Sequence, residues 1–301
     1  MPELPDITVY VDALAGKALG QCVTRLRVYN PFVLRTAVPP ITAIDGQILV
    51  AVERLGKRVV LVLGNGMCLV IHLMIAGRLH WLATAATGPK GKRGPSGKAL
   101  ASVEFESGQL LLTEAGTQRR ALIHLLADRC ALQAMDPGGI DVLSCDNAAF
   151  ELRLRSANHT LKRALTNPAL FSGIGNAYSD EILHRARLSP MALTRALGPA
   201  AIQRLFEACR SLLVEWTERL RRLAQPSGWP DKVTAFRPEM AVHGRYGLPC
   251  PECAAPVQRI VHADNETNYC ARCQTGGKLL ADRALSRLLK GSWPKHIDDL
   301  D

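Results

Sequence analysis

The stretch CPECAAPVQRIVHADNETNYCARCQ (residues 250–274) contains two Cys-x-x-Cys turns separated by sixteen residues. The four thiols belong to Cys250, Cys253, Cys270 and Cys273. Two such turns at this spacing are typical of a tetrahedral four-thiolate zinc site, in which each turn presents two sulfurs. Four protein ligands leave no open position for water, so we expect one structural Zn²⁺. A redox pair is the alternative, but the β-type residues between the turns favour a zinc-stapled hairpin.

The composition indicates a globular protein with a polyanionic partner. The chain has 301 residues, of which 48% are hydrophobic and 21% charged, and a formal net charge of +10. This length predicts two or three domains, and the basic excess favours nucleic acid as the partner. No apolar run reaches 18 residues, no signal-peptide pattern opens the chain, and the five other cysteines are scattered. We therefore expect a cytoplasmic protein without a membrane span.

The pattern of apolar residues changes along the chain. Residues 6–17 have helical spacing, residues 18–125 carry short Val/Leu/Ile runs typical of a β-sandwich or barrel, and helical spacing dominates the second half until about residue 223. The sequence therefore predicts an α+β protein. The predicted bounds are 1–125 for the β-domain, 126–148 for a linker, 149–240 for a helical domain, 241–275 for the zinc finger and 276–301 for a C-terminal extension.

The N-terminus, MPELPD (residues 1–6), has two prolines on either side of a glutamate. Part of it is explained as a helix start, with Pro5 at the first helical position and Asp6 in the first turn, where it favours the helix dipole. That interpretation gives no purpose to Pro2 and Glu3. These two residues are therefore candidates for a function of the chain end itself.

A second candidate lies in GIGNAYSDE (residues 173–181), where small residues precede a helix. The exposed backbone N–H groups at such a helix start favour a phosphate. Asn176 either caps this helix or donates to a phosphate. From the residues alone, the cap is the favoured interpretation.

Taken in order, five features resemble the formamidopyrimidine-DNA glycosylase/endonuclease VIII family: PELPD, the lysine of ERLGKRVVL, the HLxxxG strand, GIGNAYSDE and CxxC…CxxCQ. The resemblance covers residues 2–275 and implies an N-terminal helix with a two-layer β-sandwich, a helix–two-turn–helix DNA-binding domain and a zinc-finger hairpin. It further implies a monomeric, bacterial-type repair enzyme that excises damaged bases from double-stranded DNA and cleaves the strand at the abasic site. Residues 276–301 extend past the usual end and are interpreted as an extra basic helix.

The resemblance implies catalytic roles at the N-terminus. Removal of Met1 would expose the secondary amine of Pro2, which would attack the sugar C1′, displace the base and form an iminium that permits β- and δ-elimination. Glu3 would be the general acid and base. Lys57 would contact a phosphate beside the lesion, although without the resemblance it is a solvated hairpin charge.

The resemblance also implies contacts with DNA. His72 and Asn176 would hold phosphates around the extruded nucleotide, and His243 falls where the family has a phosphate-binding tyrosine. For His72 the competing interpretation is a satisfied core histidine. The gap left by the flipped base would be filled by side chains from two loops. The candidates for this role are Met74 or Ile75, Arg119, and its neighbour Arg120.

Three positions depart from the family pattern. The zinc hairpin has Asn265 where the family has a phosphate-binding arginine or lysine, and Ala121 replaces a wedge phenylalanine. Asp6 replaces a glutamate. These changes leave the two proposed catalytic residues, Pro2 and Glu3, in place and alter positions that recognise the damaged base. Oxidised pyrimidines, ring-opened purines and bulkier lesions are therefore all candidate substrates.

Two other classes of function each fit part of the sequence. The first is a damage- or abasic-site-binding protein on the same scaffold, with little excision activity. The second is a zinc-ribbon RNA-binding or transcription factor, which leaves the N-terminus unexplained.

Overall fold

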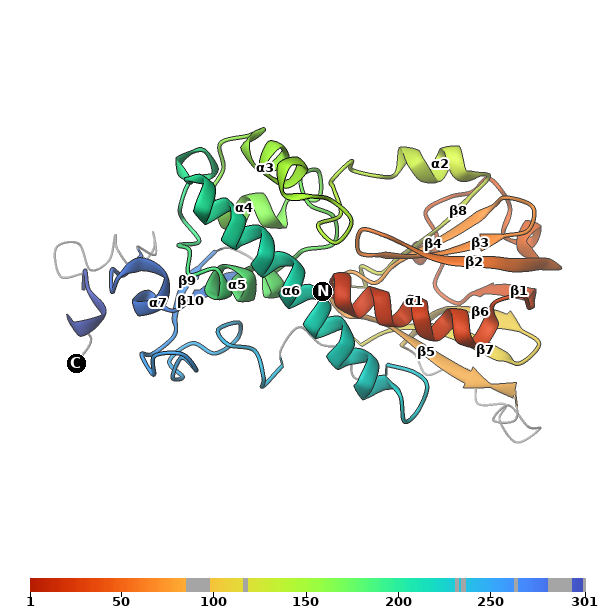
Figure 1. The fold of residues 1–301 in the computed structure, drawn as a ribbon. Helices are drawn as coiled ribbons and strands as arrows, with labels where there is room; N and C mark the ends of the chain where they lie inside the picture. The colour runs from red at the N-terminus through yellow and green to blue at the C-terminus, as the bar shows by residue number, and fades with distance from the viewer. Residues whose placement is uncertain are drawn as a thin grey trace. The chain divides into compact units, whose positions relative to one another are not determined.

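The computed structural model describes residues 1–84, 98–115, 119–230, 233, 237–262, 265–280 and 294–299. The chain divides into two compact units (Figure 1). The first comprises Met1–Pro137 and Trp216–Thr234, and the second comprises Gly138–Glu215 and Ala235–Asp301. No helix in the described part of the chain is both long enough and apolar enough to cross a membrane.

The first unit is an antiparallel sheet with one long helix. Its elements are α1 (Leu4–Ala18), β1 (Cys22–Val28), the 3₁₀ turns η1 (Pro31–Val33) and η2 (Ile41–Ile44), β2 (Gln47–Leu55), β3 (Arg58–Leu63), β4 (Cys68–His72), β5 (Gly77–Ala83), β6 (Ala99–Phe105), β7 (Gly108–Glu114), β8 (Leu122–Leu126) and α2 (Arg129–Ala134). The strand order is β5-β7-β6-β1-β2-β3-β4-β8.

The sheet folds over between β1 and β2. These strands share only two partner pairs, Cys22↔Ile48 and Val23↔Gln47. Figure 1 shows β2, β3, β4 and β8 in one layer and β1, β5, β6 and β7 in the other. Buried side chains of both layers and of α1 form one core cluster, as the prediction of an N-terminal helix on a two-layer β-sandwich requires. The fold prediction is confirmed.

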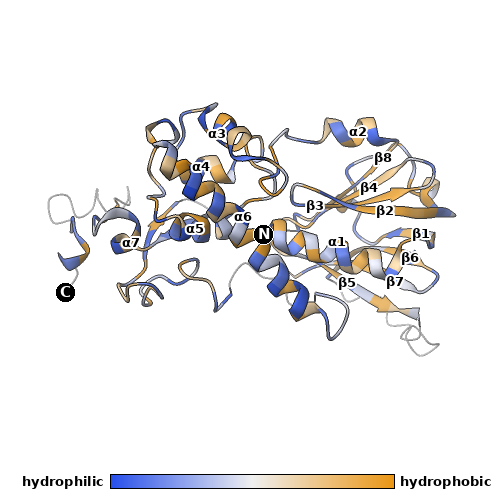
Figure 2. Ribbon diagram, viewed as in Figure 1, coloured by the Kyte–Doolittle hydropathy of each residue, from blue (hydrophilic) through white to orange (hydrophobic). Residues whose placement is uncertain are grey.

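Strands β3 and β4 are apolar on both faces, which explains their unbroken Val/Leu/Ile runs. Figure 2 shows hydrophobic residues along both strands. Leu61 and Leu69 face the main core, whereas Val60 and Val70 form a second cluster with Leu132 of α2. Alternate residues of a strand point to opposite faces, so α2 gives the second face a cover.

The end of α6 (Pro199–Ala224) and the following loop belong to the first unit. Trp229 lies between Tyr10 and Trp81, with ring centroids 5.8 and 6.2 Å away, and its indole N–H donates to the Leu79 carbonyl at 2.9 Å. A buried indole needs such a partner for its N–H. This contact joins α1, β5 and the loop after α6 in one core.

The second unit is helical and ends in a hairpin. It contains α3 (Asn147–Arg155), α4 (Leu161–Thr166), α5 (Asn176–Arg185), η4 (Thr194–Ala196), the first part of α6, β9 (Gln258–Val261), β10 (Glu266–Tyr269), α7 (Ala271–Thr275) and η6 (Ile297–Asp299). Strands β9 and β10 pair antiparallel between the two Cys-x-x-Cys turns. Most of the predicted C-terminal basic helix, residues 281–293, lies outside the described residues.

Candidate active site and zinc centre

The start of α1 buries Pro2 and Glu3. Glu3 is the N-cap residue, its side chain and that of Asp6 form a capping box, and the Glu3 backbone N–H donates to Asp6 Oδ2 at 2.9 Å. Both acidic residues are only 2% exposed, and Pro2 is buried beside them. Since Leu4 is the first helical residue, Pro5 occupies the second helical position. The prediction that Pro5 takes the first position is wrong by one residue.

The α-amino group of Met1 lies in a field of mixed charge. Burial is the largest influence on this amine and lowers its pKa. The negative charges of Glu3 and Asp6 oppose the shift, and the positive charges of Arg78 and Lys57 reinforce it. A lowered pKa favours the neutral, nucleophilic form of an amine. The chain end therefore lies where a neutral amine is favoured.

The turn between β2 and β3 positions Lys57. Leu55 pairs with Arg58, so Gly56 and Lys57 form a two-residue hairpin turn. Gly56 has φ of 60°, a left-handed conformation that such turns require and that glycine adopts without strain. Lys57 thus stands at the tip of a tight hairpin, on the same unit as Pro2.

Arg78 is a site residue that the sequence analysis missed. Its Nη1 donates to the Gly77 carbonyl at 2.7 Å and to the Ile75 carbonyl at 3.3 Å. These bonds hold the guanidinium against the turn that precedes β5. The available signal was its position directly after HLMIAG, a motif that the family resemblance already included.

The HLMIAG segment (residues 72–77) forms a tight turn after β4. Met74 has φ of 51°, and a Cβ at position 77 would lie 2.3 Å from the Leu73 carbonyl oxygen, so only glycine fits there. Ile75 is 56% exposed. Of the two predicted wedge residues, Ile75 is therefore the exposed apolar side chain.

His72, at the end of β4, is half-buried. Burial lowers its pKa to about 4, with Arg58 and Lys57 adding to the shift. The imidazole is therefore neutral near pH 7. A contact between His72 and a phosphate would thus be a neutral hydrogen bond.

The loop before β8 presents two arginines and buries one alanine. Arg119 and Arg120 are exposed. Ala121 is 3% exposed, belongs to the core cluster, and donates its backbone N–H to Glu114 Oε2 at 2.9 Å. The Ala121 side chain is therefore too small and too buried to fill the gap left by a flipped base.

In the second unit, Asn176 is the first residue of α5, and the N-cap residue is Gly175. The interpretation of Asn176 as a helix cap is wrong. Its Nδ2 instead donates to the Glu266 carbonyl of β10 at 3.0 Å. This bond ties the start of α5 to the zinc hairpin, a contact between residues far apart in the sequence.

Two adjacent carboxylates of α5 anchor the segment before the zinc finger. Glu181 accepts the backbone N–H groups of Ala241, Val242 and His243 at 2.7, 2.8 and 2.9 Å. Burial raises the pKa of Glu181, and these three donors oppose the shift. Asp180 Oδ2 is 2.8 Å from Nδ1 of His243, which is 4% exposed. His243 is therefore a buried, oriented imidazole.

The four predicted zinc ligands lie together. All four Sγ atoms are within 4.8 Å of one another, with 3.9 Å between Cys250 and Cys273 and 3.4 Å between Cys253 and Cys270. Tetrahedral Zn–S bonds of about 2.3 Å place the sulfurs roughly 3.8 Å apart, so this cluster fits one Zn²⁺. His184 Nε2 of α5 lies 3.3 Å from Cys250 Sγ.

Asn265 is exposed and lies in the connection between β9 and β10, directly before β10. Its carbonyl accepts the backbone N–H of His262 at 2.8 Å. Because Asn265 is exposed, its side chain can take part in a surface contact. The amide is uncharged, so it cannot form an ion pair with a phosphate.

Comparison with known families accounts for this arrangement. Models of the formamidopyrimidine-DNA glycosylase N-terminal domain, the formamidopyrimidine-DNA glycosylase H2TH domain and the zinc finger found in FPG and IleRS match residues 1–124, 139–221 and 247–276. The chain belongs to the formamidopyrimidine-DNA glycosylase family. The third match identifies the four-cysteine cluster as a zinc-finger site for one structural Zn²⁺.

Individual relatives cover much of the chain. The formamidopyrimidine-DNA glycosylase of Thermus thermophilus is 31% identical over 92% of this chain and 100% of its own. An uncharacterized formamidopyrimidine-DNA glycosylase-like protein of Mycobacterium tuberculosis is 40% identical over 52% of this chain and 96% of its own.

Solved structures share the fold. The crystal structure of the MutM (Fpg) protein from Thermus thermophilus matches with a TM-score of 0.75 at 29% identity, covering 91% of this chain and 98% of that one. A structure of MutM in complex with carbocyclic 8-oxo-G containing DNA matches with a TM-score of 0.77 at 22% identity, covering 91% and 100%.

Proposed function

We propose that this protein is a bifunctional DNA glycosylase and abasic-site lyase that removes oxidised or ring-opened bases from double-stranded DNA. The observation that supports this most is the burial of Pro2 and Glu3 at the capped start of α1, in the field of Lys57 and Arg78. Membership of the glycosylase family supports the same reaction class.

The reaction begins once Met1 is removed and Pro2 carries the chain's amine. The lone pair of this amine forms a bond to C1′, and the bond from C1′ to the damaged base breaks. Glu3 donates a proton to the sugar ring oxygen, which opens the ring. The N–H proton that the amine loses on attack is taken up by the departing base. As the C1′–O4′ bond breaks, the nitrogen lone pair forms the C1′=N bond of an iminium, which has no N–H proton to lose and therefore stays cationic. Loss of the C2′ proton expels the 3′ phosphate, and a second elimination expels the 5′ phosphate.

The cations near the chain end are proposed to assist both the release of the base and the cleavage of the strand. In the chain with Met1 present, burial and then the positive charges of Arg78 and Lys57 lower the pKa of the Met1 α-amino group, and a lowered pKa favours the neutral form of an amine. The same charges stabilise phosphate groups as they leave. Lys57, at the tip of its hairpin, is the proposed contact with the phosphate beside the lesion.

The remaining proposed DNA contacts come from both units. An Asn side-chain NH₂ has two hydrogens, so Asn176 can donate one to Glu266 and one to a phosphate. His243, oriented by Asp180, and the exposed Asn265 are proposed contacts beside it. In the first unit, Ile75 and Arg119 are proposed to fill the gap left by the flipped base. Met74 is the alternative to Ile75 in this role, and Arg120 is the neighbour of Arg119.

A panel of lesion duplexes tests this function. We expect base release from duplexes with a ring-opened purine or an oxidised pyrimidine, and strand cleavage of a duplex with a preformed abasic site. Each substrate is compared with its undamaged duplex. Absence of both base release and cleavage, with zinc bound and the fold intact, would contradict the proposal.

A second candidate is a protein that binds damaged or abasic DNA without excising bases. It is favoured by the buried Ala121 at the wedge position and by the uncharged Asn265. Tight binding of the abasic duplex without cleavage would support it. We favour the enzyme because the altered positions recognise DNA, whereas Pro2, Glu3 and Lys57 are present.

A further inference from the structure

Among its described residues the first unit buries three acidic side chains, one of which lies away from the capped start of α1. Glu3 and Asp6 form that capped start. The third is Glu114, the last residue of β7, which is 2% exposed. Burial of a carboxylate is costly unless hydrogen bonds compensate it, so a buried glutamate at the end of a strand needs a structural reason.

The Glu114 carboxylate holds a backbone group seven positions further along the chain. Its Oε2 accepts the N–H of Ala121 at 2.9 Å. Ala121 directly follows Arg119 and Arg120 and directly precedes β8. A hydrogen bond from a backbone N–H to a carboxylate is charge-assisted, and therefore stronger than one to a neutral acceptor. The bond fixes the point at which the chain enters β8 after the two arginines.

The backbone of Glu114 contacts a second segment, the HLMIAG turn. Glu114 is the strand partner of Gly77, the last residue of this turn and the first of β5. The Gly77 N–H donates to the Leu73 carbonyl at 2.9 Å, which closes the turn. A Cβ added at position 77 would lie 3.0 Å from Cβ of Ala121, so the two segments approach each other closely. Glu114 therefore contacts one segment through strand pairing and the other through its carboxylate.

Each of these two segments carries an exposed side chain with the same proposed task. Ile75 of the turn is 56% exposed, and Arg119 is exposed two residues before Ala121. Both are proposed to fill the gap left by the flipped base. An arginine in that gap can donate hydrogen bonds to the edge of the unpaired opposite base, so its placement affects which opposite base is accepted.

We propose that Glu114 is a positioning residue that presents Arg119 beside Ile75 and thereby sets the preference of the enzyme for the base opposite the lesion. The carboxylate acts through the Ala121 N–H and does not touch DNA. The proposal rests on the proposed function, because it concerns the side chains that replace the extruded nucleotide.

Base release from duplexes that differ only in the base opposite a ring-opened purine is the first arm of the test. The opposite-base ratio is the single-turnover rate with the most favoured opposite base divided by the rate with the least favoured one. We expect Glu114→Ala to lower this ratio at least about threefold, because a displaced Arg119 no longer selects. Glu114→Gln keeps an acceptor oxygen and should recover most of the ratio. Glu106→Ala, an exposed acidic residue between β6 and β7, is the matched control and should keep the wild-type ratio.

A double-mutant cycle shows whether Glu114 acts through Arg119. Arg119→Ala alone should lower the opposite-base ratio, and the addition of Glu114→Ala should lower it no further. A loss of stability alone would leave the ratio unchanged, because both rates come from the same folded protein. Additive losses in the double variant would overturn the proposal, as would equal ratios for Glu114→Ala and Glu106→Ala.

A shorter carboxylate keeps the test decisive if Glu114→Ala does not fold. Glu114→Asp retains the charge but is one methylene too short to reach the Ala121 N–H. We expect its opposite-base ratio to fall below that of Glu114→Gln, which keeps the length and loses the charge. Equal ratios for these two variants and wild type would overturn the proposal.

The two proposals fail in different ways. If wild-type protein releases no base from any lesion duplex, the proposed function fails. If wild type releases base without preference for the opposite base, or if the Glu114 variants keep its ratio, only the positioning role of Glu114 fails.

Discussion

The backbone N–H of Glu3 donates to Asp6 Oδ2 across 2.9 Å, in a site where both residues are almost completely buried. This bond closes the first turn of α1 and fixes the direction in which the chain leaves the helix. Pro2 is attached directly to the capped residue. Asp6 is therefore a positioning residue for the proposed nucleophile, and it achieves this although the family pattern has the longer glutamate at this position.

Removing the Asp6 carboxylate should affect both stability and chemistry. We expect Asp6→Ala to lower the free energy of unfolding by about 1–2 kcal/mol, because a cap is lost and the buried Glu3 N–H has no acceptor. Urea denaturation measures this change, and single-turnover cleavage of abasic DNA should slow by at least about tenfold. Asp6→Asn keeps an acceptor oxygen and should recover most of both. Asp12→Ala, on the exposed face of α1, is the control, and an equal slowing by both alanine variants would remove the positioning role.

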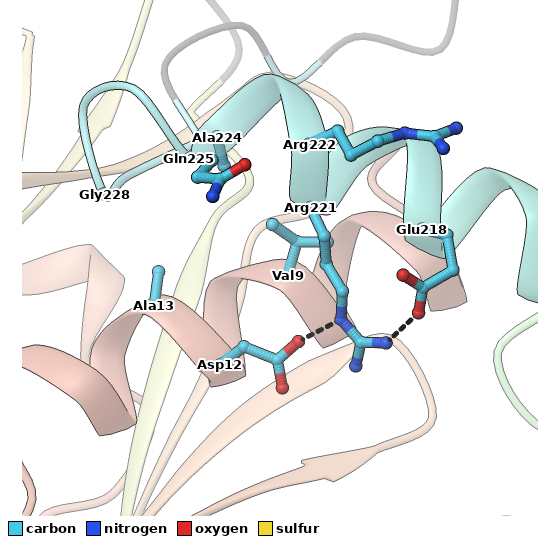
Figure 3. A pocket seen from close by; sticks show the side chains of 9 residues that line it. All are labelled: Val9, Asp12, Ala13, Glu218, Arg221, Arg222, Ala224, Gln225 and Gly228. Carbon is cyan, nitrogen blue, oxygen red and sulfur yellow. Dashed lines mark hydrogen bonds and ion pairs between the residues drawn. The ribbon is translucent and has the colours of Figure 1, made fainter.

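The control residue lies in a groove between α1 and the end of α6. Figure 3 shows Arg221 reaching from α6 to Asp12 and Glu218, at 2.8 and 2.5 Å. Val9 and Ala13 line the same groove. Exposed pairs of this kind contribute roughly 0–1 kcal/mol, so loss of the Asp12 carboxylate should change stability little.

Substitution of Glu3 separates the two stages of the proposed reaction. Glu3→Gln keeps the size of the side chain but cannot donate a carboxylic-acid proton. We expect base release to fall by at least about 100-fold, while cleavage of a preformed abasic site persists. Quantifying free base and cleaved strand in the same reactions provides the comparison. Equal loss of both activities in a folded variant would contradict this division of roles.

The zinc centre should hold one ion per chain. We expect Cys250→Ser to bind less zinc and to lose affinity for DNA, because a structural zinc stabilises the β9–β10 hairpin that carries Asn265. Metal analysis and duplex binding measure the two effects. A variant with full zinc content and full affinity would disprove the ligand assignment.

His184 supports this centre from α5. Its Nε2 is 3.3 Å from Cys250 Sγ, and hydrogen bonds to metal ligands commonly change metal affinity by about 10- to 100-fold. We expect His184→Phe to bind one zinc but to release it at least several-fold faster to a colorimetric chelator. His262→Gln, in the hairpin, is the control. Equal release rates for both variants and wild type would show that the contact does not support the metal.

The buried environment of His72 predicts a dependence of stability on pH. Its pKa is about 4 in the folded chain, against an ordinary value of 6.5. Between these values the unfolded chain binds a proton that the folded chain does not, so stability is lost as pH falls from 6.5 towards 4. We expect His72→Gln to show a smaller loss between pH 7 and pH 5 in urea unfolding. His80→Gln, in β5 of the same unit, is the control, and identical pH profiles for His72→Gln and wild type would contradict the assignment.

Features that depend on local spacing were predictable from the sequence. The periodicity of residues 6–17 indicated α1, and the two Cys-x-x-Cys turns indicated the zinc hairpin. The position of Pro5 was missed by one residue, because the cap is chosen by the bond between Glu3 and Asp6. The domain bounds and the catalytic roles stay predictions.

Features that depend on distant partners were not predictable. The Asn176 amide finds the Glu266 carbonyl ninety residues away, which removes the cap that local pattern favoured. Trp229 packs against Tyr10 across most of the chain. The bond between Glu114 and Ala121 likewise exists only once β7 and β8 have taken their places in the folded sheet.

The central claim is that the amine of Pro2 attacks the sugar. Borohydride reduction during reaction with abasic-site DNA, followed by mass spectrometry of the cross-linked peptide, tests it most directly. We expect a covalent adduct on Pro2, and none from a control chain carrying extra residues before Met1 that block its removal. An adduct on a lysine such as Lys57, or no adduct despite bound abasic DNA, would contradict the account.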